Sequence, residues 1–160
     1  MNKDFKKLEK NLGYSFQKKE TLVKALTHVS KSKENNEVFE FLGDSVLNLI
    51  ISQILVEKFS MEDEGTLSLM RSKLVSRTTL NKIAKKLELD SFIIKGDSLA
   101  GQETPENILG NSLEAIFGAV YKESGLEFIQ KIIETTFTRE IELLREGNLK
   151  NSKTLLQEYC

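Results

Sequence analysis

Apolar residues recur along most of the chain at spacings of three and four, which is the period of an amphipathic α-helix. Valine, isoleucine and threonine do not gather in short alternating runs bounded by turns, so no strand is predicted. The pattern predicts an all-α fold of about seven helices. They are expected near residues 8–16, 22–26, 37–59, 67–75, 78–87, 105–124 and 128–146.

Residues that favour helix starts precede two of these segments. Asn35 and Asn36 can cap the long helix that follows them. Thr104 is expected to be an N-cap, with Pro105 at the first helical position, where its missing N–H costs nothing. The helix after Pro105 is apolar on several sides, which predicts a central, buried element.

Glycines mark the expected ends. Glu64-Gly65 is expected to separate two helices, and Gly125 to end the buried one. The last helix is expected to end near Gly147. We therefore expect one domain over residues 1–147, with residues 148–160 as a C-terminal tail or the start of a linker.

The composition is that of a soluble globular protein, with 39% hydrophobic and 29% charged residues among 160. No apolar run is expected to reach the roughly 20 residues of a membrane span, and the charged N-terminus does not resemble a signal peptide. The single cysteine, Cys160, cannot form an internal disulfide, which fits a cytoplasmic protein. No glycine-rich phosphate loop occurs, so no nucleotide cofactor is expected.

Charge is distributed unevenly although the net charge is only −1. Residues 65–87 contain no acid. The cations of that interval are Arg71, Lys73, Arg77, Lys82, Lys85 and Lys86. These cations can form solvated helix faces, or they can form a basic surface for the phosphates of a nucleic acid.

Two apolar helices carry acids where packing favours apolar side chains. Glu40 and Asp44 are four residues apart and share a helix face, where their like charges raise the pKa of at least one carboxyl. Glu114 lies on the other helix, three residues after Asn111. If the two helices are antiparallel neighbours, the three acids converge on an oxygen-rich site. Such a site suits Mg²⁺, which can polarise a phosphate and activate a water.

Simpler interpretations of the same residues remain open at this point. Glu40 and Asp44 can form an exposed acidic stripe, and Glu114 can be a surface acid or a buried salt-bridge partner. The only histidine, His28, is predicted to be structural, hydrogen-bonded within the N-terminal helices. A structural His28 counts against hydrolysis by a nucleophile–histidine pair.

The segment 36–47, NEVFEFLGDSVL, resembles the signature of the ribonuclease III family, with Val38-Phe39 where the family has Arg-Leu. Four further elements match in order and spacing: Leu26-Thr27-His28 with Ser30, Glu64-Gly65 with Leu67-Ser68, Glu114-Ala115 with Gly118-Ala119-Val120-Tyr121, and Lys153-Thr154-Leu155-Leu156-Gln157-Glu158. The resemblance covers about residues 5–158.

The resemblance implies the all-α endonuclease fold of this family, assembled as a symmetric homodimer. It implies cleavage of double-stranded RNA with Mg²⁺, or Mn²⁺ as a substitute, which leaves 5′-phosphate and 3′-hydroxyl ends. Ribosomal precursor and messenger RNAs would be the substrates. The implied metal ligands are Glu40, Asp44, Asn111 and Glu114, of which Asp44 and Glu114 are also catalytic.

Other implied roles lie outside the metal site. Phe41 matches an aromatic residue that the family inserts into its partner subunit, and Glu37 is expected beside it at the dimer interface. The residues implied to contact RNA are Glu64, Arg71, Lys73 and Arg77. Phe39 is expected to belong to the core.

One departure from the family pattern concerns the metal site. Asn111 stands where the family usually has aspartate, and an amide oxygen can ligate a metal but brings no charge. We expect cleavage that is retained but requires more Mg²⁺. The alternative is a catalytically impaired ribonuclease III-like dimer that binds structured RNA without efficient cleavage. A di-iron helical bundle would require Glu-x-x-His motifs, which the sequence lacks.

A second departure concerns the C-terminus. Bacterial members of the family usually continue into a double-stranded-RNA-binding domain, and residues 148–160 match the start of the linker to it. Without that domain, RNA binding is expected to be weak and strongly salt-sensitive, because few phosphate contacts remain.

Overall fold

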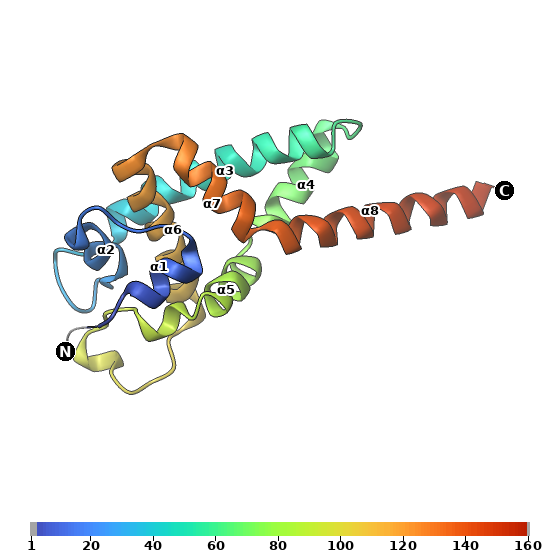
Figure 1. Ribbon diagram of the computed structural model, residues 1–160. Helices are drawn as coiled ribbons and strands as arrows, with labels where there is room; N and C mark the ends of the chain where they lie inside the picture. Colours follow the sequence, from blue (N-terminus) through green and yellow to red (C-terminus); the bar gives the residue numbers. More distant parts are fainter. Residues whose placement is uncertain (1–2, 160) are drawn as a thin grey trace.

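The computed structural model describes residues 3–159, and over that range its regular secondary structure is helical apart from an isolated parallel bridge between Thr27 and Ile94 (Figure 1). Within this range the α-helices are α1 (Lys6–Leu12), α2 (Lys19–Leu26), α3 (Glu37–Lys58), α4 (Glu64–Leu74), α5 (Arg77–Lys86), α6 (Glu106–Ser124), α7 (Leu126–Thr136) and α8 (Thr138–Tyr159). Two short 3₁₀ turns, η1 (Leu89–Ser91) and η2 (Asp97–Leu99), lie between α5 and α6. The prediction of an all-α fold is confirmed, with one more helix than expected.

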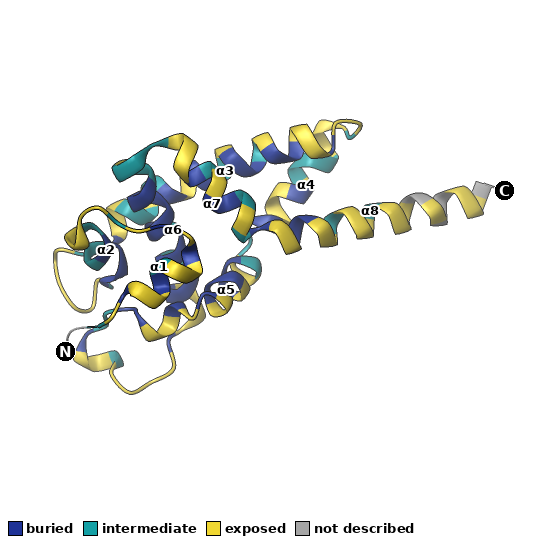
Figure 2. Ribbon diagram, viewed as in Figure 1, coloured by how far each residue is buried: buried dark blue, intermediate teal, exposed yellow. Residues whose placement is uncertain are grey.

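The centre of the fold is the pair formed by α3 and α6, which make the most extensive contact between any two of these helices. Helix α6 also packs against α2, α5 and α7, while α3 also packs against α4 and α7. Leu113, Phe117 and Val120 of α6 are fully buried. Figure 2 shows the buried residues gathered where these helices meet. The prediction that this helix is central and buried is confirmed.

The predicted helix starts are confirmed at α3 and corrected at α6. The side chain of Asn35 accepts the Glu37 N–H at 3.0 Å, while Asn36 occupies the N-cap position without a capping side-chain bond. Thr104 does not cap α6, because the N-cap residue is Pro105. The Thr104 hydroxyl instead bonds side chains of the preceding loop, since that buried group finds its partners there.

The predicted break at Glu64-Gly65 is wrong, because α4 begins at Glu64. The carboxylate of Asp63 accepts the Thr66 N–H at 2.8 Å and so caps the helix one residue before the predicted break. These hydrogen bonds lower the pKa of Asp63. Gly125 ends α6 as predicted, with a φ of 85° that side-chain-bearing residues rarely adopt.

The helix predicted over residues 128–146 is two helices, α7 and α8. Phe137 lies between them and is fully buried, with its ring centroid 6.4 Å from that of Phe117. The expected end near Gly147 is also wrong, since α8 continues and projects away from the rest of the fold (Figure 1). A single glycine costs a helix only about 1 kcal/mol, which its neighbours can outweigh. The domain boundary expected at Gly147 stays a prediction.

Helix α3 meets two general criteria for a membrane span, but acids interrupt its apolar residues, so the expectation that no apolar run reaches about 20 residues still holds. An 18-residue stretch within this 22-residue helix has a mean hydropathy of 1.5, so α3 alone among the described helices is long and apolar enough to cross a membrane by those two criteria. The core helix of a globular fold meets the same criteria. Helix α3 packs in this way, against α6, α4 and α7.

Candidate active site

Helices α3 and α6 touch backbone to backbone at Gly43 and Gly118. A Cβ on Gly43 would lie 1.7 Å from the carbonyl oxygen of Glu114, and one on Gly118 would lie 2.1 Å from the carbonyl oxygen of Phe39. Because no side chain fits at either position, glycine permits the close approach of the two helices. Asp44 follows Gly43 directly, and Glu114 lies one turn before Gly118. The crossing therefore brings acids from two helices together.

The structure couples the three predicted acidic ligands electrostatically. Burial, the charges of Asp44 and Glu40, and a hydrogen bond with the Asp44 carboxyl raise the pKa of Glu114 to about 8. Partial burial, together with the charges of Glu37 and Asp44, raises the pKa of Glu40. Burial is the largest cause of both shifts, and the neighbouring carboxylates add to it. The crossing therefore places Glu114 near Asp44 and Glu40, and their convergence on one metal site stays a prediction.

A hard divalent cation fits these donors. In the described part of the chain, no three His, Cys, Asp or Glu side chains already stand at the spacing of a metal-ligand set. The three carboxylates are therefore near one another without forming a ready-made set of metal ligands. Mg²⁺ does not require a closed cage, because it binds one or two carboxylates and keeps several waters. Oxygen donors also suit Mn²⁺.

Asn111 lies on α6 three residues before Glu114, so the two share one side of the helix. It is half-buried. The preceding residue, Gly110, lies against α5, because a Cβ there would stand 3.0 Å from the side-chain oxygen of Asn81. Helix α5 thus supports the segment of α6 that carries Asn111.

Asn48 is a site residue that the sequence reasoning missed. Its amide nitrogen donates to the carbonyl oxygen of Asp44 at 2.8 Å and to Oδ1 of the same residue at 3.2 Å. The Ser52 hydroxyl donates to the Asn48 carbonyl at 2.7 Å and accepts from Arg71 at 2.9 Å. A line of hydrogen bonds therefore runs along α3 from Asp44 to α4. The spacing of four residues on a helix was the available signal.

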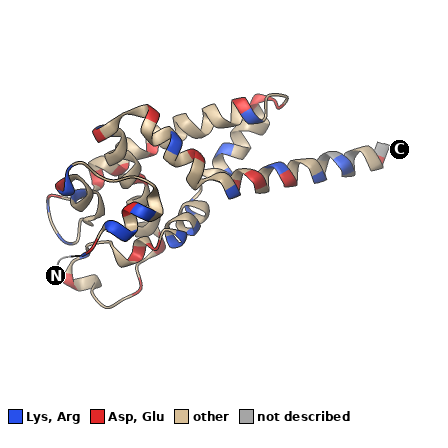
Figure 3. Cartoon of the chain, in the orientation of Figure 1, with Lys and Arg blue, Asp and Glu red and all other residues tan. Residues whose placement is uncertain are grey.

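The four residues implied to contact RNA are exposed on α4 and the first turn of α5. They are Glu64, Arg71, Lys73 and Arg77. Glu64 accepts a hydrogen bond from the Ser68 hydroxyl at 2.7 Å. Figure 3 shows basic residues along α4 and α5.

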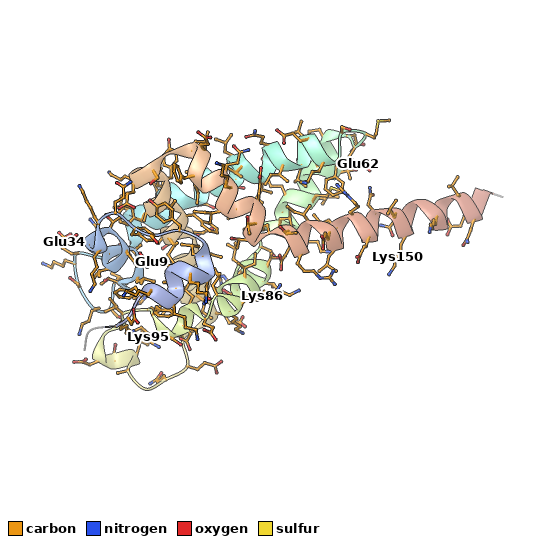
Figure 4. All side chains as sticks on the ribbon, in the orientation of Figure 1. Glu9, Glu34, Glu62, Lys86, Lys95 and Lys150 are labelled. Carbon is orange, nitrogen blue, oxygen red and sulfur yellow. The ribbon has the colours of Figure 1, made fainter. Side chains whose placement is uncertain are left out.

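The C-terminal part of the basic interval has other partners. Lys85 pairs with Glu106 of α6 at 3.7 Å, and Lys86, labelled in Figure 4, pairs with Glu140 of α8 at 3.3 Å. Glu140 is only 6% exposed, so the second pair joins α5 to a buried position on α8. Both lysines therefore have acidic partners on α6 and α8, although their own side chains stay about half exposed.

Phe41 lies on the outer face of α3 and is 78% exposed. Val38 and Leu49 on the same helix are also exposed, as is Glu37. Single exposed apolar residues are ordinary, but several on one core helix indicate a contact surface. Phe39, in contrast, is half-buried and packs against the core, as predicted.

His28 makes structural contacts. Its Nδ1 lies 2.7 Å from the Ser30 hydroxyl, which also accepts the Gly96 N–H at 3.0 Å. The His28 N–H donates to the carbonyl of Ile94 at 2.9 Å. These bonds join the segment after α2 to the segment before α6, so His28 has structural contacts as predicted, but its partners lie in these segments and not within the N-terminal helices.

The chain is similar in sequence to proteins of one family. The Ribonuclease-III-like family profile matches residues 18–141. Ribonuclease 3 of Francisella philomiragia is 43% identical over 157 residues, which are 97% of this chain and 68% of that protein. Ribonuclease 3 of Shewanella sp. (strain MR-7) is 41% identical over 160 residues, covering 98% of this chain and 71% of that protein.

Solved structures are also similar to this chain in fold. The nuclease domain of ribonuclease III from Campylobacter jejuni matches with a TM-score of 0.79 and 42% identity, over 84% of this chain and 99% of that chain. That structure is described as flexible in a region involved in dimer formation. Dicer from Pichia stipitis matches with a TM-score of 0.66 and 30% identity, over 82% of this chain and 60% of that one.

Proposed function

Because the chain belongs to the ribonuclease III family of endoribonucleases, we propose that it hydrolyses phosphodiester bonds of double-stranded RNA at the α3–α6 crossing. The observation that carries this proposal is the position of Glu114, whose pKa is raised to about 8 by burial and by the nearby carboxylates of Asp44 and Glu40. The products carry 5′-phosphate and 3′-hydroxyl ends. Ribosomal precursors and messenger RNAs in the cytoplasm are the proposed substrates.

Glu40, Asp44 and Glu114 would hold Mg²⁺, or Mn²⁺ in its place, with Asn111 as a further oxygen ligand. When bound, the metal supplies polarisation of the phosphate and a lower pKa of water. Asn48 orients the Asp44 carboxylate through the 3.2 Å bond to Oδ1. Glu114 binds a metal only as a carboxylate, so it must first release the proton that its raised pKa retains. The affinity for the metal therefore rises as the pH approaches 8.

The proposed active form is a symmetric homodimer. A twofold interface uses the same patch on both subunits, and the outer face of α3 offers Phe41, Val38 and Leu49 as apolar contacts. Glu37 lies beside them. We propose that residues 1–147 form the endonuclease domain and that residues 148–160 form its C-terminal extension.

The RNA-binding surface is proposed on α4 and the start of α5, through Glu64, Arg71, Lys73 and Arg77. Arg71 is joined to Asp44 by hydrogen bonds along α3, which supports placing the duplex beside the acids. Contacts to phosphates carry little sequence information, so binding should depend on salt more than on sequence.

A cleavage assay on labelled duplex RNA with Mg²⁺ tests this function. We expect both strands to be cut, and Glu114→Gln to slow cutting by at least about 100-fold, because loss of a ligand costs more than loss of its hydrogen-bond support. Duplex RNA that is bound but left intact with either metal contradicts the proposal. That result would favour an impaired dimer that binds structured RNA without cleavage.

Asn111 is the observation that keeps this alternative in view, because it supplies an oxygen without a charge. We expect cleavage by this chain to require more Mg²⁺ than cleavage by its Asn111→Asp variant. Titrating Mg²⁺ against both proteins measures the difference as a lower half-maximal concentration for the variant. Identical curves contradict a role for Asn111 in metal affinity.

A further inference from the structure

The N-terminal segment is strongly basic in a chain whose net charge is −1. Residues 1–33 contain nine lysines and three acids. Lys6, Lys10 and Lys19 are exposed on α1 and α2, and the proposed cleavage of duplex RNA uses none of them. A concentration of cations outside the proposed active site raises the question of what they bind.

A surface hollow of about 380 Å³ lies between α1 and α2 in this segment. Its lining combines cations with apolar side chains: Lys3, Lys6 and Lys19 with Phe5, Phe16 and Leu22. Phe16 is half-buried and so keeps part of its ring accessible, whereas Phe5 is only 9% exposed. Lys19 Nζ lies 6.0 Å from the centre of the Phe5 ring.

Both acids that border the hollow already accept bonds from the backbone. Asp4 Oδ1 accepts the Lys6 N–H at 3.0 Å, and Glu9, labelled in Figure 4, accepts the Phe16 N–H at 2.8 Å. Among the described residues, the side chains of Lys6 and Lys19 form no ion pair within 4.0 Å, unlike those of the neighbouring Lys7 and Lys24. Their charges therefore remain available to an anionic ligand.

A second hollow, of about 350 Å³, continues from the first. The two share Lys6 and Glu9 as lining residues, and the second adds Lys10. Lys19 thus lines the first hollow, Lys10 the second, and Lys6 both. The two adjoining hollows therefore offer lysines to more than one phosphate.

We propose that these hollows bind a short single-stranded segment of RNA, with a base against Phe16 and phosphates at Lys6 and Lys19. Proteins that bind single strands without sequence preference combine a basic groove with aromatic rings on which bases stack. Lysine acts as a point charge and reads no base edge, so the site tolerates any sequence. The proposal takes RNA as its ligand from the proposed function, but it requires no cleavage.

Fluorescence anisotropy with a labelled eight-nucleotide oligouridine tests the site, in low salt with EDTA so that no cutting occurs. We expect Lys6→Ala/Lys19→Ala to weaken binding about tenfold, since it removes two phosphate contacts. The matched control is Lys31→Ala/Lys33→Ala, which removes the same charge from an exposed loop outside the hollows and should change binding by less than about twofold.

Phe16→Leu tests the base contact, because it keeps an apolar side chain but removes the ring. We expect at least about a fivefold loss of affinity, from the usual contribution of one stacked base. A thermal melt shows that the variant is folded. A folded Phe16→Leu variant with unchanged affinity overturns the placement of a base in the hollow.

Other outcomes also overturn the proposal. Equal losses of oligouridine affinity in the two double-lysine variants would show that binding is general charge attraction. No measurable binding of the oligonucleotide in low salt would show that the hollows are not a binding site. Competition by uridine monophosphate as strong as that by the oligonucleotide would assign the hollow to a free nucleotide. Binding to anionic phospholipid vesicles in place of RNA would assign it to a membrane surface. Duplex cleavage is measured separately on Lys6→Ala/Lys19→Ala and should be unchanged, so failure here is distinguishable from failure of the proposed function.

Discussion

The α3–α6 crossing and the basic surface of α4 and α5 differ in how far their charged side chains are exposed to solvent. At the crossing, backbone contact brings the helices that carry Glu40, Asp44 and Glu114 together, and burial, followed by the repulsion among these acids, raises the pKa values of Glu40 and Glu114. On α4 and α5, the cations extend into solvent, and Lys85 and Lys86 have acidic partners.

The difference shows that hydration and side-chain mobility determine how strongly neighbouring like charges repel one another. Exposed lysines are hydrated and can turn away from one another, so their repulsion is small. Glu40 and Glu114 are partly buried at the crossing, so their charges are less hydrated and a proton or a cation is needed to offset them. Single substitutions should therefore have large effects at the crossing and small effects on the basic surface.

Gly43→Ala should have the largest effect, because its Cβ would stand 1.7 Å from the Glu114 carbonyl oxygen and would force α3 and α6 apart. We expect a loss of about 3 kcal/mol or more in the free energy of unfolding, measured by chemical denaturation, together with loss of cleavage. The matched control is Gly147→Ala in α8, where a Cβ meets nothing within 4 Å. The control should gain about 0.5–1 kcal/mol, and a comparable loss in both variants contradicts the tight crossing.

The second largest expected effect is the pH dependence of the stability of the metal-free protein. Since the pKa of Glu114 is raised from 4.5 to about 8, the folded state holds a proton that the unfolded chain releases between those values. Stability is thus greatest below pH 4.5 with respect to this group and is lost as the pH rises through 8. We expect the Tm in EDTA to fall between pH 5 and pH 8, and Glu114→Gln to remove most of that fall.

Adding Mg²⁺ to the same Tm measurement tests whether Glu114 helps to bind the ion. At pH 8 it should raise the Tm of the unaltered protein, because it replaces the proton as the compensating charge. The Tm of Glu114→Gln should respond much less. An equal response of both proteins would place the bound ion elsewhere.

Asn48→Ala should have an intermediate effect, because it frees the Asp44 carboxylate without removing a ligand. We expect the Mg²⁺ concentration for half-maximal Tm shift to rise about tenfold, in the range of lost hydrogen bonds to metal ligands. Gln53→Ala is the matched control, since Gln53 makes a similar 3.2 Å contact to Glu57 farther along α3. The two variants should differ; a similar rise in both would remove Asn48 from the site.

Lys73→Ala/Arg77→Ala should have the smallest effect on the fold, within about 0.5 kcal/mol of the unaltered protein. Duplex RNA affinity should weaken, and the slope of log affinity against log salt should fall by about 1 for each lost phosphate contact. Lys85→Ala is the comparison, because Lys85 already pairs with Glu106. A slope that changes equally in both proteins contradicts the assignment of the basic surface.

Local pattern was enough to predict the helices and to select the acids, because helical periodicity and the rarity of acids on apolar helices are properties of short segments. Helix ends were less predictable. Thr104 and Gly147 have residue types that favour a cap or an end, but the structure uses Pro105 as the N-cap and continues α8 through Gly147. Capping preferences amount to about 1 kcal/mol, so neighbouring contacts override them.

The sequence by itself determined an all-α fold and the family, and it predicted three acids and one amide as a metal site. Only the tertiary structure decided how these residues meet. Gly43 and Gly118 lie far apart in the chain, and neither shows alone that it marks a backbone contact. The same holds for the basic hollow between α1 and α2. The physical reason is that electrostatic coupling and burial depend on distances through space, which a one-dimensional pattern does not contain.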